Sequence, residues 1–265
     1  MKKVLIIISG IIILFIYAKI RLSITADWLD KSLITFLGVD EFGRDNFAVA
    51  ILSSINSMVT AIALTLFAFI TGSIVAFSAI LAKVKFIKTI LHASGTLIES
   101  CPVIVWLFVI IVGFRDYPRF VIVSVTFILA AIPYLSNVIF GELERLWHAD
   151  FIESARIAGL SNLRIGFKYL LPNTLSVITP VLINVYGAAL TVNGVIGVLG
   201  MGNRMDLEIG TLLLRGKENI TTNPQIMLIA ILSLITIYFI IILIGQEIKK
   251  RVMGERNIIT DKVMT

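Results

Sequence analysis

The sequence predicts an all-α protein that crosses a membrane several times. Of its 265 residues, 58 % are hydrophobic and only 15 % are charged, and the mean hydropathy is +0.98. A soluble domain carries about one quarter charged residues. The apolar residues also gather in blocks that approach the roughly 20 residues needed to cross a bilayer. Composition and pattern together exclude a soluble enzyme, a disordered chain and a disulfide-rich scaffold.

Six apolar segments are predicted to span the membrane. The last five are long enough, at about 1.5 Å per residue, to cross the hydrocarbon layer. The first is shorter, and its alternative reading is the apolar core of a signal peptide, although Lys19 and Arg21 follow it directly. Residues 45–57 either form a separate helix along the outer leaflet or extend the second span. The six segments are residues 4–17, 58–81, 92–114, 120–140, 175–196 and 225–246.

Basic residues predict the orientation. With the N-terminus inside, the cytoplasmic segments carry more Lys and Arg than the outer ones, and the run Lys249-Lys250-Arg251 directly follows the last span. The net charge of +6 therefore indicates orientation in a membrane rather than binding of nucleic acid. We predict that both termini are cytoplasmic, with an outer segment up to residue 46 and a basic cytoplasmic tail over residues 249–265.

A few polar residues within the predicted spans are candidates for a solute path. Glu99, Asn137 and Asn184 lie at membrane depth, where such groups usually face a bundle interior or a cavity. The alternative is that Glu99 is protonated, or that it bonds within the bundle to Ser100 or Asn137. Cys101 lies in an apolar block, and one cysteine with two histidines does not supply a structural zinc site. We predict no metal site.

The longest predicted cytoplasmic segment, residues 141–173, differs from the spans. Apolar residues recur at helical spacing over residues 143–155 and again over residues 163–171. Gly159 interrupts the pattern, and Pro172 is expected to end the second helix. We predict two short amphipathic helices with a bend at Gly159–Ser161, a shape suited to docking a soluble partner.

Residues Glu153-Ser154-Ala155, Gly159 and Tyr169-Leu170-Leu171-Pro172 are spaced as in a known loop. The chain resembles the membrane subunits of binding-protein-dependent ABC importers, whose cytoplasmic loop reads E-A-A-x3-G-x9-I-x-L-P. Ser154 and Tyr169 depart mildly from that pattern. The resemblance implies that the loop forms a coupling helix that inserts into a cleft of an ATPase subunit. Its site residues would be Glu153, Ser154, Ala155, Gly159, Leu171 and Pro172.

Two further stretches are similar to one permease of the peptide and nickel importers. The stretch LGVDEFGRD, residues 37–45, matches the pattern LGTDxxGRD, with Val39 in place of Thr. Residues 197–216 are similar to the region SFLGLG…WG…GR but lack its Trp-containing piece. The resemblance implies a type I ABC importer permease whose transmembrane domain covers residues 47–248. Peptides, nickel, other metal chelates and opine-like compounds all remain open as its solute.

The resemblance also implies partners and a location in the cell (inner) membrane. They are a second homologous permease subunit, two ABC ATPase subunits, an extracellular solute-binding lipoprotein and membrane lipid. The ATPase subunits would bind ATP and Mg, so no cofactor is expected in this chain. In agreement, the glycine-containing stretch 194–202 is not followed by the GK[ST] of a phosphate loop.

Two alternative functions predict other sequence features. An ion-gradient-driven secondary transporter would use Glu99 as its titrating group and would show a repeat of its spans, and no convincing repeat is present. A membrane-embedded enzyme would need converging His, Asp or Glu residues, whereas His92 and His148 are isolated in the sequence. We therefore expect a transport subunit without catalytic residues.

Overall fold

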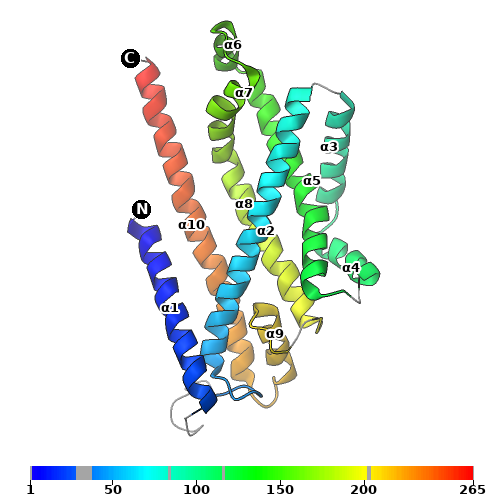
Figure 1. Cartoon of the computed structure of the whole chain (residues 1–265), viewed down its shortest axis with the longest axis vertical. Coiled ribbons are helices and arrows are strands. Elements are labelled where there is room, and N and C mark those ends of the chain that lie inside the picture. Colours follow the sequence, from blue (N-terminus) through cyan, green and yellow to red (C-terminus); the bar gives the residue numbers. More distant parts are fainter. Residues whose placement is uncertain (1, 28–37, 83–84, 115–116, 202–203, 265) are drawn as a thin grey trace. The chain divides into compact units, whose positions relative to one another are not determined.

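The computed structural model describes residues 2–27, 38–82, 85–114, 117–201 and 204–264. Over these residues the chain consists of helices joined by turns (Figure 1). One isolated bridge joins Val39 and Asp45. This confirms the predicted all-α class. The contacts divide the chain into a first unit, Met1–Ile62 with Ala189–Ile244, and a second unit, Ala63–Ala188 with Gly245–Thr265.

Four of the predicted spans are confirmed as long apolar helices. Among the described residues, four helices are long and apolar enough to cross a membrane. Helix α2 is continuous, so residues 46–57 extend the second span and do not form a separate helix. The four are α2 (Asn46–Ala82), α5 (Arg119–Trp147), α8 (Leu171–Val198) and α10 (Pro224–Met264).

The predicted span over residues 92–114 is not one continuous helix. The structure has α3 (Lys85–Glu99) and α4 (Val103–Phe114), of 15 and 12 residues, with a break between them. Pro102 explains the break, because proline lacks an N–H and disfavours helical backbone at the residue before it. The first predicted span lies within α1 (Lys2–Asp27), whose described residues are not among the four long apolar helices. The predicted count of six spans is therefore not confirmed.

Small residues bring the helices of the first unit together. Ala18 of α1 packs with Ala48 and Leu52 of α2, and all three are buried. Helix α9 (Ile209–Glu218) touches α8 where Gly210 meets Gly197, with no room for a Cβ at either position. Such contacts let helices approach closely, as is common in membrane proteins.

Helix α5 forms the centre of the second unit. Both α3 and α4 pack against it. A Cβ built on Gly72 of α2 would lie 3.2 Å from the Cβ of Leu135, and Gly95 of α3 lies against Asn137. The ring of His92 contacts the ring of Phe140 edge to face, with centroids 5.3 Å apart. These contacts fix the faces of α5 that meet α2 and α3.

The predicted loop contains more helix than expected. Helix α5 runs through Trp147, so the first predicted loop helix is interrupted at residues 148–149 and resumes as α6 (Asp150–Ile157). A turn leads to α7 (Asn162–Ile165), which continues into a short π-helix, η1 (Gly166–Leu170). The two short helices with a bend between them are thus confirmed, with a shifted start.

Pro172 does not end the second helix, contrary to the prediction. It lies in the first turn of α8, and the preceding residue Leu171 has right-handed helical backbone. A proline inside a helix cannot donate to the carbonyl four residues back, and its ring crowds that carbonyl. The wider π turn over Gly166–Leu170 ends two residues before Pro172, and local π adjustments re-satisfy backbone groups that a proline frees in membrane helices.

Candidate functional site

The turn between α6 and α7 closes with a defined hydrogen-bond pattern. The Leu160 N–H donates to the Ala155 carbonyl at 3.1 Å, and the Gly159 N–H donates to the Arg156 carbonyl at 2.9 Å. Gly159 has a φ of +79°, in the left-handed region that residues with a Cβ rarely adopt. This is a Schellman motif, and it explains why the sequence has glycine at this position.

The next residues start the following helix. The Ser161 Oγ accepts a hydrogen bond from the Arg164 N–H at 3.4 Å, and Ser161 has extended backbone. A serine N-cap satisfies a donor that the first turn would otherwise leave open. Gly159 and Ser161 therefore end one helix and begin the next within three residues, which makes the bend a rigid turn.

The predicted coupling residues lie on both faces of α6, in the turn after it and at the start of α8. Ala155 is buried with Ile152, and this side holds α6 against the protein. Glu153, Ser154 and Gly159 are exposed. Leu171 is half-buried and Pro172 is exposed at the start of α8. Within the described residues the Glu153 carboxylate makes no hydrogen bond or ion pair, so it is available to a partner.

Large apolar side chains surround this turn and face solvent. Ile157 is 84 % exposed and Phe167 is 73 % exposed, and Leu163 is exposed as well. The Phe167 ring stacks on that of Phe77 of α2, with centroids 6.5 Å apart. Exposed apolar groups close together indicate an interaction surface. We call Ile157, Leu163 and Phe167, with the exposed residues Glu153 and Gly159, the turn surface.

Arg156 braces α6 against the end of α5. Its guanidinium lies 4.6 Å from the centre of the Trp147 ring, and its Nη2 donates to the Trp147 carbonyl at 3.4 Å. A cation over an aromatic face is attracted by the negative charge of the ring face. A force on the turn is thus transmitted to α5 through a side-chain contact as well as through the backbone.

The predicted path residues are only partly brought together. Asn184 of α8 lines a cavity of about 250 Å³ together with Ile98 and Cys101, which flank Glu99 in the chain. The side chain of Glu99 itself lies outside the described part of the structure. Asn137 does not line this cavity and instead lies against Gly95. The structure therefore supports a shared location for Asn184 and the segment around Glu99.

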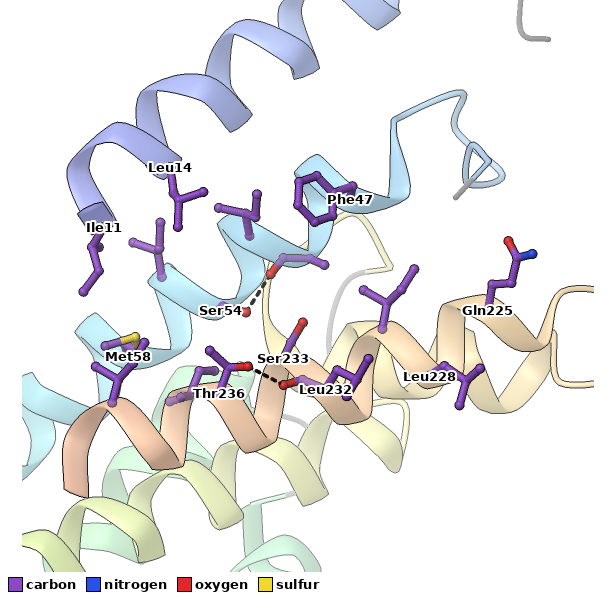
Figure 2. Close-up of a pocket in the computed structure, with 16 residues that line it drawn as sticks. Ile11, Leu14, Phe47, Ser54, Met58, Gln225, Leu228, Leu232, Ser233 and Thr236 are labelled. Carbon is purple, nitrogen blue, oxygen red and sulfur yellow. Dashed lines mark hydrogen bonds between the residues drawn. The ribbon is translucent and has the colours of Figure 1, made fainter. Parts of the chain in front are cut away.

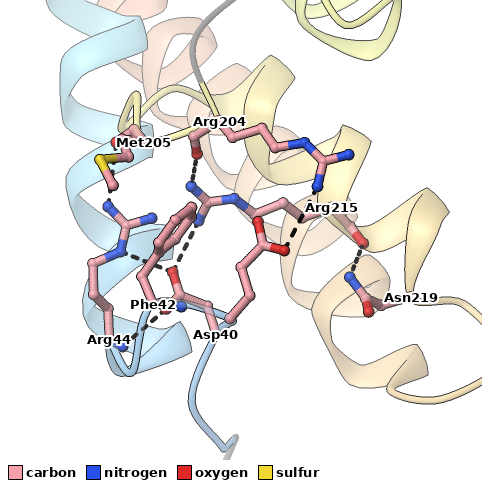
Figure 3. Close-up of polar contacts among 8 residues, drawn as sticks. Asp40, Phe42, Arg44, Arg204, Met205, Arg215 and Asn219 are labelled. Atoms are coloured by element: carbon pink, nitrogen blue, oxygen red, sulfur yellow. Dashed lines mark hydrogen bonds and ion pairs between the residues drawn. The ribbon is translucent and has the colours of Figure 1, made fainter.

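A cluster of charges lies in the first unit, around Asp40 (Figure 3). The Asp40 Oδ2 accepts from the Arg44 Nε at 2.8 Å and from the Arg215 Nη1 at 3.0 Å. Its Oδ1 accepts from the backbone N–H groups of Phe42 and Arg44 at 2.9 and 2.8 Å. The Phe42 ring lies against both guanidinium groups, 4.9 Å from that of Arg44 and 5.4 Å from that of Arg215. Asp40 thus organises the LGVDEFGRD stretch, whose first residue Leu37 is outside the described residues.

Arg215 connects this stretch to α9 and to the segment before it. The residue is 3 % exposed, and its Nη2 donates to the Arg204 carbonyl. Burial lowers the pKa of the Arg215 guanidinium from its ordinary value, and the positive charge of Arg44 adds to this effect. The Arg204 guanidinium in turn pairs with Glu218 at 2.9 Å and with Glu41 at 3.6 Å. We call Asp40, Arg44, Arg204 and Arg215 the charge cluster.

Sequence reasoning placed Asp40 and Arg215 in two separate motifs and did not predict that they meet. One signal was available: Arg215 is a single charge within the apolar run TLLLRG, where a cation needs a buried partner. Tyr134 and Cys101, which line the cavity with Asn184, were also missed as site residues. For this cavity the sequence signal was Pro102, which follows Cys101 within a predicted span, because interrupted membrane helices often form solute sites.

A larger cavity of about 660 Å³ lies in the first unit, lined by α1, α2 and α10 (Figure 2). The Ser54 Oγ donates to the Ala50 carbonyl at 2.7 Å, and the Thr236 Oγ1 donates to the Leu232 carbonyl at 2.8 Å. These hydroxyl groups are satisfied within their own helices, and the described lining residues include no charged side chain. This cavity therefore suits an apolar occupant.

Comparison with known proteins links these features to a family. The model of the family described as "Binding-protein-dependent transport system inner membrane component" matches residues 68–254. Proteins of Brucella suis, Brucella abortus and Brucella melitensis, named as peptide transport system permease proteins, are each 26 % identical over 165 residues. These matches cover 62 % of this chain and 54 % of each relative, so the chain spans about half the length of the curated relatives it matches.

A solved structure shares the fold. The inward-facing MetNI methionine ABC transporter, in its CY5 native crystal form, superposes with a TM-score of 0.61 at 20 % sequence identity. The match covers 77 % of this chain and 96 % of that chain. At this level of identity the likeness concerns the arrangement of helices.

Proposed function

The chain belongs to the family of binding-protein-dependent transport system inner membrane components, and we propose that it couples ATP hydrolysis by partner subunits to uptake of a peptide. Its fold is that of a type I ABC importer permease. In this role it forms half of a translocation path, and the other half comes from a second, homologous permease subunit.

The observation that carries the proposal is the rigid turn at Gly159. The Schellman motif and the Ser161 cap hold the turn, while Glu153 and the apolar groups of the turn surface face outward. A soluble ATPase that grips this surface moves α6 as a body. For ATP binding to drive transport, the ATPase must bind the turn with different free energies in its two states.

The partners follow from the same role. Two ABC ATPase subunits bind ATP and Mg and dock on the cytoplasmic face, one of them on the turn surface. An extracellular solute-binding lipoprotein delivers the solute to the outer face. Both termini are then cytoplasmic, and the segment over residues 249–265 is a basic cytoplasmic tail. The domain over residues 47–248 is the membrane-embedded part.

The names of the Brucella relatives support a peptide as the solute. The importer type that the sequence resembles also takes up nickel and metal chelates. Nickel is therefore the alternative solute in the uptake test described next. Membership in a family of binding-protein-dependent systems argues against a secondary transporter that uses Glu99 alone.

Uptake of a radiolabelled dipeptide and of nickel by cells with and without this subunit tests the function. We expect dipeptide uptake that depends on the subunit and continues when a protonophore collapses the ion gradient, because ATP supplies the energy. Uptake that stops with the gradient and continues without the ATPase subunits would overturn the proposal.

A substitution in the turn surface tests the docking role. Ile157→Asp places a charge on an 84 % exposed apolar residue, so it should reduce co-purification of the ATPase without unfolding the chain. Ile220→Asp is the matched control, since Ile220 is also an exposed isoleucine and lies in the turn after α9. Equal co-purification of both variants with the ATPase would place docking elsewhere.

A further inference from the structure

The break between α3 and α4 interrupts a segment that the sequence predicts to lie in the membrane. Helix α3 ends at Glu99 and α4 begins at Val103, and the Cys101 N–H turns back to the Ile98 carbonyl at 3.3 Å. Non-helical backbone at membrane depth is tolerated where it is buried in protein or lines a cavity. Interrupted helices are also common at the solute sites of transporters.

A cavity lies at this break. It has a volume of about 250 Å³, and its walls come from the end of α3, from α5 and from α8. Sites for whole small molecules usually measure roughly 300–1,000 Å³. The cavity therefore suits one part of a larger solute. Its lining residues are Ile98, Cys101, Phe127, Ala130, Ala131, Tyr134, Asn184, Val185 and Ala188.

The lining combines an apolar wall with uncharged polar groups. Phe127 and Val185 present apolar surface, and the small alanine side chains of α5 and α8 leave the space open. Asn184, which is exposed, contributes a side-chain amide that both donates and accepts hydrogen bonds, as a peptide amide does. The described lining residues, which do not include the side chain of Glu99, contain no Lys, Arg, Asp or Glu, so none of these side chains would compensate the burial of a charged group.

We propose that this cavity receives an uncharged apolar side chain of the transported peptide, while the Asn184 amide hydrogen-bonds the adjoining peptide group. The proposal rests on the proposed function and adds to it the class of peptide and the residue that recognises it. Asn184 is then a specificity residue of the path, and Cys101 reports on occupancy of the cavity.

The single cysteine of the chain can be used to test this proposal. This residue, Cys101, is exposed, and it lies in the lining. The experiment follows the reaction of Cys101 with N-ethylmaleimide by mass spectrometry, in the assembled transporter in lipid nanodiscs. Ala-Phe at millimolar concentration should slow the reaction several-fold. Ala-Lys, Ala-Asp and Ni²⁺ should leave the rate unchanged.

Two variants test the roles of the lining. Asn184→Ala should abolish the protection by Ala-Phe, whereas Asn173→Ala, the same change on α8 outside the cavity, should retain it. Ala188→Phe fills the cavity, so it should lower uptake of Ala-Phe relative to Ala-Lys several-fold. Protection that survives Asn184→Ala, or stronger protection by Ala-Lys, Ala-Asp or Ni²⁺, would overturn the proposal.

The outcomes separate this inference from the proposed function. If the transporter takes up Ala-Phe while Cys101 reacts at an unchanged rate, the cavity assignment fails and the permease assignment stands. If it takes up nickel and none of the dipeptides, the peptide assignment fails, and the cavity assignment fails with it.

Discussion

The Asp40 carboxylate accepts a hydrogen bond from the Arg215 Nη1 at 3.0 Å, although 175 positions of sequence separate the two residues. Both side chains are almost fully buried. Every described hydrogen bond of Asp40 goes to the LGVDEFGRD stretch or to Arg215. This one carboxylate therefore ties the segment before α2 to α9 within the first unit.

Removing the Asp40 carboxylate should destabilise the first unit. Asp40→Ala leaves the buried Arg215 guanidinium without its anionic partner, and breaking a buried pair in this way costs about 3–5 kcal/mol. Chemical denaturation of the purified protein in detergent measures the change in free energy of unfolding. The control is Glu218→Ala, which breaks the exposed pair with Arg204 and should cost at most about 1 kcal/mol. Equal losses would contradict the role given to Asp40.

A second prediction concerns the backbone of the turn. Gly159→Ala should cost about 1–2 kcal/mol because a Cβ is disfavoured in the left-handed conformation, although the site has open space around it. The matched control is Gly141→Ala in α5, which also has open space but has helical backbone. That change should stabilise the helix by roughly 0.5–1 kcal/mol. Denaturation midpoints should move in opposite directions, and shifts of the same sign would contradict the assignment.

A third prediction concerns the contact between α3 and α5. A Cβ at Gly95 would collide with the Asn137 side chain, so Gly95→Ala should cost roughly 1–3 kcal/mol through overpacking. Asn137→Gly in the same chain should recover part of this loss, because it removes the colliding Cβ, Cγ and Nδ2 atoms of Asn137, and the single variant accounts for the cost of glycine within α5. A double-mutant cycle measures the coupling. Additive effects would show that the two residues do not meet.

The topology predicts the side from which two exposed positions can be reached. A cysteine at Ser161, in a Cys101→Ser background, should react with an impermeant maleimide in inside-out vesicles alone. A cysteine at Ile220 should react in intact cells alone, because the turn after α9 lies on the outer side in the proposed orientation. Reversed labelling of the pair would place the termini outside.

Sequence periodicity was sufficient for the long helices and for the turn. The apolar runs of α2, α5, α8 and α10 are long enough that no alternative structure in a bilayer satisfies their backbone groups. The bend at Gly159 was predictable as well, because glycine followed by a serine N-cap is a local signal. Both are properties of neighbouring residues.

The predicted helix ends were wrong at two prolines, because the effect of a proline depends on the structure around it. Pro102 split a predicted span, whereas Pro172 was accommodated by the π turn before it and did not end its helix. The residue type was the same in both cases, so sequence alone did not distinguish them. The candidate path shows the same limit, since Asn184 lines the cavity and Asn137 does not.

The sequence by itself determined the all-α membrane class, the main apolar helices and the Gly159 turn, because each depends on composition or on residues within one or two helical turns. Only the tertiary structure decided that Asp40 pairs with Arg215 and that Asn184 lines one cavity with the break after Glu99. Such meetings depend on how helices pack, and packing is set by contacts between residues far apart in the chain.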